Sequence, residues 1–316
     1  MTNTITHPKI TKTPSHYWQR TWMLYLMLFL PMAFFVVFRY IPMTNIVIAF
    51  KDYNIFRGVW NSPWVGLKWF NQAFQSQDFY YSLRNTLVLN FLDLVVGFPA
   101  PVILAILLNE LASFKMYKKV TQTVIYLPHF LSWIIVAGIA SQLLAPSGGV
   151  VNIMLGKLGL GPIDFLMKKG LWIGTYAGLG VWKEMGWGTI IYLAAITGIN
   201  PELYEAAEVD GAGRWRKIWY VTLPGIRSTI VVLLILNLGR ILGSEFDRPY
   251  TLANPTVMQV ADVISTLVYR VGIRSSQFSL TAAVGLFQSV VCVIFLFSAN
   301  ALAKKPESGA FGRRPP

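Results

Sequence analysis

Glu205-Ala-Ala-Glu-Val-Asp-Gly-Ala-Gly-Arg-Trp-Arg-Lys-Ile-Trp-Tyr-Val-Thr-Leu-Pro224 is a charged segment in a chain that is otherwise largely apolar. Apolar stretches flank it, Thr189–Ile199 before it and Ile226–Leu242 after it, and such stretches are typical of helices that cross a membrane. A connection at a membrane surface needs no particular order of small, acidic, glycine and basic residues. The order found here therefore indicates that a soluble partner binds the segment.

The composition places the chain among membrane proteins. Of its 316 residues, 54% are hydrophobic and 13% are charged, whereas soluble domains carry about 25% charged residues. The formal net charge is +13, but the basic residues stand at the ends of apolar blocks and form no continuous stripe of the kind that binds nucleic acid. We therefore expect contacts with anionic membrane lipid and no nucleic-acid partner.

The sequence offers no catalytic or metal site. The single cysteine, Cys292, lies inside an apolar run, and the three histidines lack partners at the spacing of metal ligands. No Gly-x-x-x-x-Gly-Lys-[Ser/Thr] loop occurs, so the chain has no such loop for nucleotide phosphates. We expect a non-catalytic protein without a metal or cofactor of its own.

Several blocks are long and apolar enough to cross a membrane, which takes about 20 residues. They are Trp22–Phe50, Asn85–Leu108, Val120–Leu144, Ile173–Ile199, Ile226–Gly243 and Ser279–Ala303. These blocks predict an all-α polytopic membrane protein with about six transmembrane helices and one transmembrane domain over residues 22–303, between tails 1–21 and 304–316. Outer loops are predicted at about 51–84, 145–172 and 244–278, and the charged segment lies in a loop over residues 200–225.

Basic residues predict the orientation of these helices. They gather in the N-terminal tail, in the connection between the second and third blocks, in the 200–225 loop and in the C-terminal tail. With six spans these segments share one side of the membrane, and an excess of Lys and Arg marks the cytoplasmic side. Both termini and the 200–225 loop are therefore predicted to be cytoplasmic.

The 200–225 loop is predicted to form two short helices joined at a tight bend. Asn200-Pro201 suits the start of a helix. Acidic residues at three-residue spacing then share one helix face: Glu202, Glu205 and Glu208. Asp210-Gly211 is a turn signal, because glycine adopts a left-handed backbone at low cost. A second helix with the basic residues follows, and Leu223-Pro224 is expected to end the unit before the fifth span.

This loop resembles the EAA loop of the membrane subunits of bacterial ATP-binding-cassette (ABC) importers. The matching residues are Glu205, Ala206, Ala207, Asp210, Gly211, Ala212, Leu223 and Pro224, and we take Arg214, the first basic residue after the turn, as part of the same surface. In that family the loop is the coupling helix that docks onto a cytoplasmic ATPase, and the resemblance implies the same role here. Ile218 stands where phenylalanine is frequent, and Ser228 where a further proline is common, which leaves open which ATPase surface the loop fits.

Further motifs extend the resemblance over nearly the whole chain, to permease subunits of type I ABC importers for oligosaccharides of the aldouronate and alginate branch. They are Ser62–Leu67, Arg84–Thr86, Gly97–Pro101, Tyr126–Phe130 and Ser147–Gly149. The resemblance implies the type I importer fold, the bacterial inner membrane and transport by alternating access. The partners that it implies are a second homologous permease subunit, two copies of an ATPase that holds ATP and Mg²⁺, a periplasmic binding protein and an oligosaccharide, which in this branch is acidic.

Ionisable residues within the spans suggest where a substrate passes, because such groups are costly in a membrane and usually face a cavity or a partner. Arg240, with Asn237 and Trp187, is our hypothesis for the path of an acidic sugar, since arginine binds a carboxylate with two hydrogen bonds. Lys183 and Glu245 belong to the same candidate set. The alternative, which we weigh equally, is an ion pair between Arg240 and Glu245.

Asp93 and Glu184 raise a different possibility. For Asp93 the favoured interpretation is a pair with a basic residue of the helix bundle. Carboxylates of this kind could also couple transport to an ion, so a stand-alone secondary transporter is the alternative function, although it leaves the order of the 200–225 loop unexplained. An integral membrane enzyme has no support in the residue pattern. Purification separates the first two classes, because an importer subunit should bring an ATPase with it.

Overall fold

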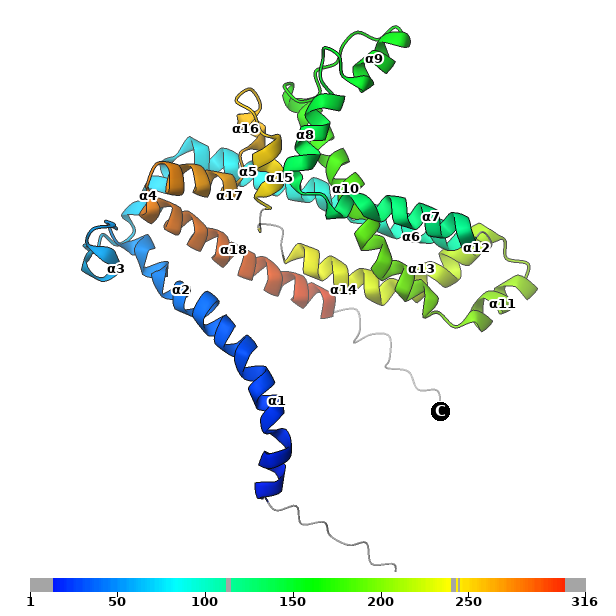
Figure 1. Cartoon of the computed structure of the whole chain (residues 1–316), viewed down its shortest axis with the longest axis horizontal. Helices are drawn as coiled ribbons and strands as arrows, with labels where there is room; N and C mark the ends of the chain where they lie inside the picture. Colours follow the sequence, from blue (N-terminus) through cyan, green and yellow to red (C-terminus); the bar gives the residue numbers. More distant parts are fainter. Residues whose placement is uncertain (1–13, 112–114, 240–242, 244, 305–316) are drawn as a thin grey trace, which may run out of the picture.

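The computed structural model describes residues 14–111, 115–239, 243 and 245–304, and this part of the chain consists almost entirely of helices (Figure 1). Its one bridge between extended segments joins Lys51 and Trp64. The described residues therefore form the all-α fold that the apolar blocks predict.

The predicted spans correspond to helices that are often divided by short π-helical or 3-10 segments. The first contains α1 (Pro14–Phe35), η1 (Val36–Tyr40), α2 (Ile41–Met43) and η2 (Thr44–Phe50); the second α5 (Gln77–Leu92), η3 (Asp93–Gly97) and α6 (Pro99–Glu110); the third α7 (Lys115–Tyr126), η5 (Leu127–Phe130) and α8 (Trp133–Leu143); the fourth α10 (Lys169–Thr197); the fifth α14 (Arg227–Leu238); and the sixth α18 (Phe278–Lys304).

Short helices fill the connections. On the predicted outer side these are α3 (Gly58–Asn61), α4 (Lys68–Gln75), α9 (Val150–Lys157), α15 (Asp247–Leu252), α16 (Met258–Ala261), α17 (Ile264–Val268) and η7 (Tyr269–Arg274). The 200–225 loop contains α11 (Pro201–Val209), α12 (Arg214–Lys217), η6 (Ile218–Thr222) and α13 (Leu223–Gly225). In Figure 1, α11 lies at the right-hand end of the molecule, and α3 and α4 lie at the left-hand end.

The picture of six similar spans is too simple. Within the described residues, Thr21–Phe50, Gln77–Glu110 and Phe278–Ser298 are long and apolar enough to cross a membrane as single helices. Two bent pairs qualify if each is one span: Met116–Phe130 with Trp133–Leu143, bent by 104°, and Arg214–Gly225 with Arg227–Leu238, bent by 60°. The first bend has a local cause, because the Ser132 side chain accepts a hydrogen bond from the Ile135 N–H and so begins a new helix.

The fourth span, α10, does not meet that test, because Lys183 and Glu184 stand near its middle. It is nevertheless the central helix of the bundle and contacts α6, η3 and η5. Its buried face follows the helical period and runs through Tyr176, Gly180, Lys183, Thr189, Ile196 and others. At about 1.5 Å per residue its 29 residues reach roughly 43 Å, enough to cross a bilayer. Protein neighbours therefore replace lipid around its polar residues.

Residues of the Arg84–Thr86 motif hold the last outer loop against the second span. The Asn85 side-chain amide donates to the main-chain oxygens of Gln259 (3.0 Å) and Asp262 (2.9 Å), and the Thr86 hydroxyl accepts from the Ile264 N–H (3.0 Å). Asn85 and Thr86 are buried. This motif thus fixes the segment that leads back to α18.

Arg270 adds a second attachment at the same place. Its guanidinium donates to Asp262 (2.6 Å) and to Asp78 at the start of α5 (3.2 Å). Burial acts to lower the pKa of Arg270, but the hydrogen bonds and charges of Asp262 and Asp78 outweigh it, so the pKa is raised. Arg270 therefore stays charged and holds η7 to α5.

Candidate functional site

The 200–225 loop forms the bend that its sequence predicts. The Asn200 side chain accepts from the Glu202 N–H (3.1 Å) and caps α11, with Pro201 in the first turn. Gly211 has φ +72°, the left-handed backbone that favours glycine. The Asp210 N–H donates to the Ala206 oxygen (3.0 Å) and the Ala212 N–H to the Ala207 oxygen (2.8 Å), which closes the end of the helix.

Two side-chain contacts hold the helices of this loop together. The Lys217 ammonium donates to Glu208 (3.1 Å), and the Tyr204 hydroxyl lies 2.9 Å from the hydroxyl of Thr222, which is buried. The first contact joins α12 to α11, and the second joins η6 to α11. Sequence reasoning did not identify the Tyr204–Thr222 contact, because nothing in the spacing of these residues indicates that they meet.

The loop ends where its sequence predicts. The helix that begins at Arg214 ends at Gly225, one residue after Leu223-Pro224, and the chain bends by 60° before α14 begins at Arg227. Proline can occupy the first turn of a helical segment because its missing N–H has no partner to lose there, and the π-helical segment η6 precedes it directly. The second helix of the loop therefore runs to the predicted end of the unit and leads into the fifth span.

The outward surface of α11 is open to a partner. Glu205, Ala206 and Asp210 are exposed, and so are the apolar side chains of Leu203 and Val209, the latter 89% exposed. Small, acidic and apolar side chains on one short helix give a surface that a protein cleft can enclose. The loop is therefore folded by its own contacts and leaves its motif residues available for docking.

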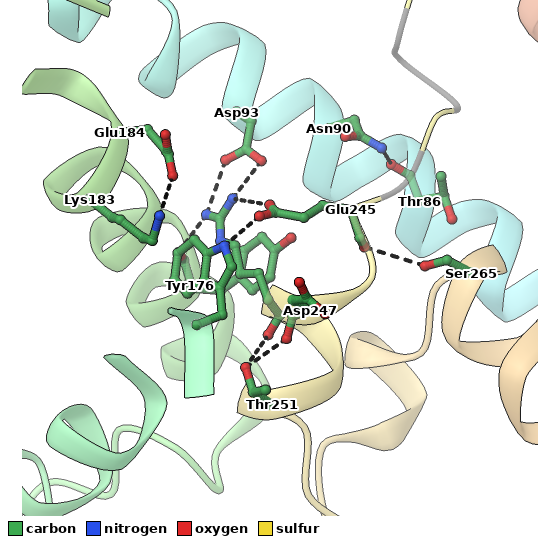
Figure 2. Close-up of polar contacts among 12 residues, drawn as sticks. Thr86, Asn90, Asp93, Tyr176, Lys183, Glu184, Glu245, Asp247, Thr251 and Ser265 are labelled. Carbon is green, nitrogen blue, oxygen red and sulfur yellow. Dashed lines mark hydrogen bonds and ion pairs between the residues drawn. The ribbon is translucent and has the colours of Figure 1, made fainter. Parts of the chain in front are cut away.

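A second site lies inside the helix bundle, around Arg248 at the start of α15 (Figure 2). The guanidinium donates to both carboxylate oxygens of Asp93 (2.8 and 3.1 Å) and to the main-chain oxygen of Tyr176 (2.6 Å). It lies 3.9 Å from the Glu245 carboxylate. It also lies over the ring of Tyr176, at 3.6 Å from the centroid, and near the ring of Trp133. We call Arg248, Asp93, Glu245, Tyr176 and Trp133 the Arg248 cluster.

Backbone geometry makes room for this cluster. Asp93 begins the π-helical segment η3, a local widening of the helix that often occurs at functional sites. On α10, a Cβ atom added at Gly180 would lie 2.0 Å from Nη2 of Arg248. Only glycine at this position lets the guanidinium pass so close to the helix. The Asp93–Arg248 pair is the type of contact that was favoured for Asp93 from sequence, with Arg248 as the partner.

A third set of residues lies next to the cluster on α10 and η5. Glu184 accepts from the Lys183 ammonium (2.8 Å) and contacts Nδ1 of His129 (2.8 Å). Lys183 is buried and also donates to the main-chain oxygen of His129 (3.1 Å). The His129 and Trp187 rings stack with centroids 4.7 Å apart and an interplanar angle of 5°.

A cavity of about 760 Å³ lies beside the Arg248 cluster and this third set. Its charged lining comes from Asp93, Glu184, Glu245 and Arg248, and its other polar or aromatic lining includes Asn90, Asn237 and Trp187. The volume is in the range of pockets that bind small ligands. The elements η3, α10, α14 and the segment before α15 all contribute to it.

The predicted path residues fall at different places. Trp187, Asn237 and Glu245 line the cavity, whereas Lys183 lies behind Glu184. Arg240 lies outside the described residues, so its pairing with Glu245 has no structural description. Among the described residues, Glu245 accepts a hydrogen bond from the Trp133 indole N–H and lies near Arg248. Sequence reasoning did not predict that Arg248 joins Asp93 to Tyr176. The only feature of Arg248 in the sequence that pointed to a role was its position close to a predicted span.

Comparisons with known proteins agree with this arrangement of helices. Residues 79–308 match the family model described as binding-protein-dependent transport system inner membrane component. The polygalacturonan/rhamnogalacturonan transport system permease protein YteP of Bacillus subtilis (strain 168) is 47% identical over 282 residues, which cover 89% of this chain and 88% of that protein.

Two solved structures are similar over nearly the full chain. One is the crystal structure of a bacterial ABC transporter involved in the import of the acidic polysaccharide alginate, with a TM-score of 0.84, 42% identity, and coverage of 92% of this chain and 98% of that chain. The other is a bacterial alginate ABC transporter in complex with an alginate pentasaccharide-bound periplasmic protein, with a TM-score of 0.84, 41% identity, and coverage of 93% and 98%.

Proposed function

This chain belongs to the family of binding-protein-dependent transport system inner membrane components, it is a permease of a sugar ABC importer, and we propose that its substrate is an acidic oligosaccharide. The observation that carries the proposal is the exposed helix α11, which a contact between Tyr204 and Thr222 holds against η6. The helix and the turn after it carry the Glu205-Ala-Ala and Asp210-Gly-Ala motifs in a chain of this family. A stand-alone secondary transporter is not favoured, because it gives this loop no role.

The ATPase is a separate partner in our proposal. ATP and Mg²⁺ bind in two copies of a cytoplasmic ATP-binding-cassette subunit, and this chain catalyses no reaction itself. Nucleotide binding brings the ATPase subunits together, the docked 200–225 loops follow, and the spans reorient between inward-open and outward-open states. This coupling requires that the ATPase bind the two states with different affinity. Both termini and the loop then face the cytoplasm, as the basic residues predict.

A second permease subunit completes the membrane pathway. The first span supports this, because none of its apolar window is buried against the rest of this chain, and in Figure 1 α1 projects away from the other helices. Lipid and a second subunit of similar fold are the surroundings that we assign to it. The cavity by the Arg248 cluster would then lie between two subunits and be closed by both.

A periplasmic binding protein delivers the sugar in our proposal. The related complex contains such a protein loaded with an alginate pentasaccharide. On this chain the predicted outer loops offer exposed apolar side chains for docking, among them Met154 and Leu158 on and beside α9 and Trp60 on α3. The acidic class of the substrate rests on the two related importers, one for alginate and one for polygalacturonan and rhamnogalacturonan.

The test measures ATP hydrolysis by the complex purified through this chain and reconstituted in lipid. Wild type is compared with the double variant Glu205→Ala, Gly211→Asp, with a binding protein loaded with alginate or oligogalacturonate added to both. We expect stimulated hydrolysis in the wild type and its loss in the variant, because the variant removes an acid of the docking surface and puts a side chain where φ is positive.

The control variant is Asp52→Asn, an exposed position outside the 200–225 loop, and it should behave as the wild type. Thermal unfolding of the variants shows whether the helices stay folded. Stimulation that persists in Glu205→Ala, Gly211→Asp would refute the docking assignment. Absence of any co-purifying ATPase would return the secondary transporter to consideration.

A further inference from the structure

The charged side chains at the cavity differ sharply in their exposure. The carboxylates of Asp93, Glu184 and Glu245 are 33%, 47% and 45% exposed. The cations beside them, Arg248 and Lys183, are only 4% and 8% exposed. The described wall of the cavity therefore exposes its carboxylates more than its cations: Arg248 lines the cavity but is almost fully buried, and Lys183 does not line it.

The buried cations are also occupied. Arg248 donates to Asp93 and to the Tyr176 oxygen, and it stacks on the Tyr176 ring. Lys183 donates to Glu184 and to the His129 oxygen. In the described part of the chain, Nε of Arg248 has no hydrogen-bond partner, but it is itself buried. Turning either cation toward a sugar carboxylate would weaken the contacts that compensate its buried charge, which is costly.

The amide groups of the wall add acceptors. The Asn90 side-chain amide donates to the Thr86 oxygen (2.8 Å), and that of Asn237 donates to the Leu233 oxygen (2.9 Å). Both residues line the cavity, and each uses an amide N–H on its own helix. Within the described residues the side-chain oxygens of Asn90 and Asn237 accept no hydrogen bond, and each amide keeps a second N–H. A sugar hydroxyl, which both donates and accepts, can use both groups.

An acceptor-rich wall selects the ligand by elementary hydrogen-bond chemistry. An ionised carboxylate only accepts hydrogen bonds, so it pairs with a sugar hydroxyl, which can donate, and repels a sugar carboxylate. Beside the carboxylates, the stacked rings of Trp187 and His129 give a flat face, with Trp187 47% exposed. Aromatic walls with a few placed polar groups are typical of small-molecule sites.

We propose that the part of the cavity formed by Asp93, Glu184, Glu245 and Trp187 receives an uncharged, hydroxyl-rich sugar ring, while the carboxylates of the oligosaccharide are held elsewhere on the path. This inference rests on the proposed function. It makes the preferred substrate a mixed oligosaccharide in which a neutral ring adjoins acidic ones. We assign specificity to Glu184 and Glu245, whose carboxylates are exposed to the cavity. Glutamine at either position removes the charge and keeps nearly the same shape.

The test measures uptake by the complete reconstituted importer of two oligosaccharides. One is an oligogalacturonate, and the other is the same oligomer with one carboxyl group reduced to a primary alcohol. The readout is the ratio of the uptake rate of the reduced oligomer to that of the fully charged oligomer. The same binding protein serves every variant, so its own preference cancels when ratios are compared between variants.

Glu184→Gln with Glu245→Gln should lower this ratio roughly tenfold, because the repulsion of the charged ring is lost in a partly desolvated site. The amide oxygens keep the hydrogen bonds from Lys183 and Trp133. The matched control, Asp52→Asn with Asp164→Asn, removes two carboxylates that do not line the cavity and should leave the ratio unchanged. If the double variant does not assemble, Glu184→Gln alone decides, with an expected fall of about threefold.

A ratio equal to that of the wild type in the folded variant would overturn this inference and leave the proposed function intact. So would a wild type that takes up the fully charged oligomer several times faster than the reduced one. If the wild type takes up neither oligomer and neither stimulates ATP hydrolysis, the proposed function fails and the inference fails with it.

Discussion

The 200–225 loop and the Arg248 cluster are both built from charged residues, but they are assembled in different ways. The loop takes its residues from one continuous segment and leaves the motif residues Glu205, Ala206 and Asp210 exposed. The cluster takes Asp93 from η3, Tyr176 from α10 and Arg248 from α15, and it buries the guanidinium. A site like the loop can be recognised from the order of neighbouring residues in the sequence. A site like the Arg248 cluster forms only when helices from distant parts of the chain pack together.

The difference also concerns what each region loses when it is changed. The exposed motif residues Glu205, Ala206 and Asp210 are proposed to contact a partner, so their replacement should impair coupling and leave the helix bundle stable. Residues of the cluster hold the bundle around the cavity, so their replacement should lower stability first. The predictions below separate the two regions by measuring both quantities on the purified complex.

The largest expected effect is that of Arg248→Met. This change leaves the Asp93 carboxylate facing an apolar side chain. Removing one partner of a fully buried pair costs about 3–5 kcal/mol, and the 33% exposure of Asp93 lowers that cost here. We expect a large fall in the thermal unfolding temperature of the reconstituted complex. The double variant Asp93→Asn, Arg248→Met should recover part of it, since the uncompensated charge is then gone. An unfolding temperature close to that of the wild type in Arg248→Met would show that the pair does not hold the bundle.

Gly180→Ala tests the same cluster from α10. The added Cβ would lie 2.0 Å from Nη2 of Arg248, so the guanidinium must move away from Tyr176, at a cost of about 1–3 kcal/mol. Gly178→Ala is a matched control, because nothing lies within 4 Å of its added Cβ and alanine favours a helix over glycine. Gly180→Ala should therefore lower the unfolding temperature and Gly178→Ala should not. Equal effects would argue against the close approach of Arg248.

Tyr204→Phe should separate coupling from stability in the loop. It removes the hydroxyl that contacts the buried Thr222, a loss of about 1 kcal/mol, and frees α11 to move relative to η6. Substrate-stimulated ATP hydrolysis should fall severalfold while the unfolding temperature changes little. Tyr220→Phe is the control, since that side chain is 80% exposed. Unchanged stimulation in Tyr204→Phe would mean that α11 is positioned by its other contacts.

Sequence reasoning reached the loop and the fold class more completely than the cavity, for physical reasons. Capping by Asn200 and the left-handed turn at Gly211 are local rules that act between near neighbours. The Arg248–Asp93 contact joins residues far apart in the chain, and no periodicity encodes it. The bend at Ser132 was also missed, because an apolar run looks the same whether it is straight or bent.

The smallest expected effect is that of Glu208→Gln. It removes the charge that faces Lys217, but Glu208 is 75% exposed, and an exposed pair contributes only about 0.2–1 kcal/mol. The expected loss of stimulated ATP hydrolysis is slight, and it should vanish above about 0.5 M salt, where the wild-type pair is screened as well. Glu202→Gln is the control, because its carboxylate contacts the Asn200 amide and not a cation. A loss of stimulated ATP hydrolysis in Glu208→Gln that does not depend on salt would instead mean that Glu208 contacts the ATPase directly. Glu208 would then belong to the docking surface and not to the residues that hold α11 and α12 together.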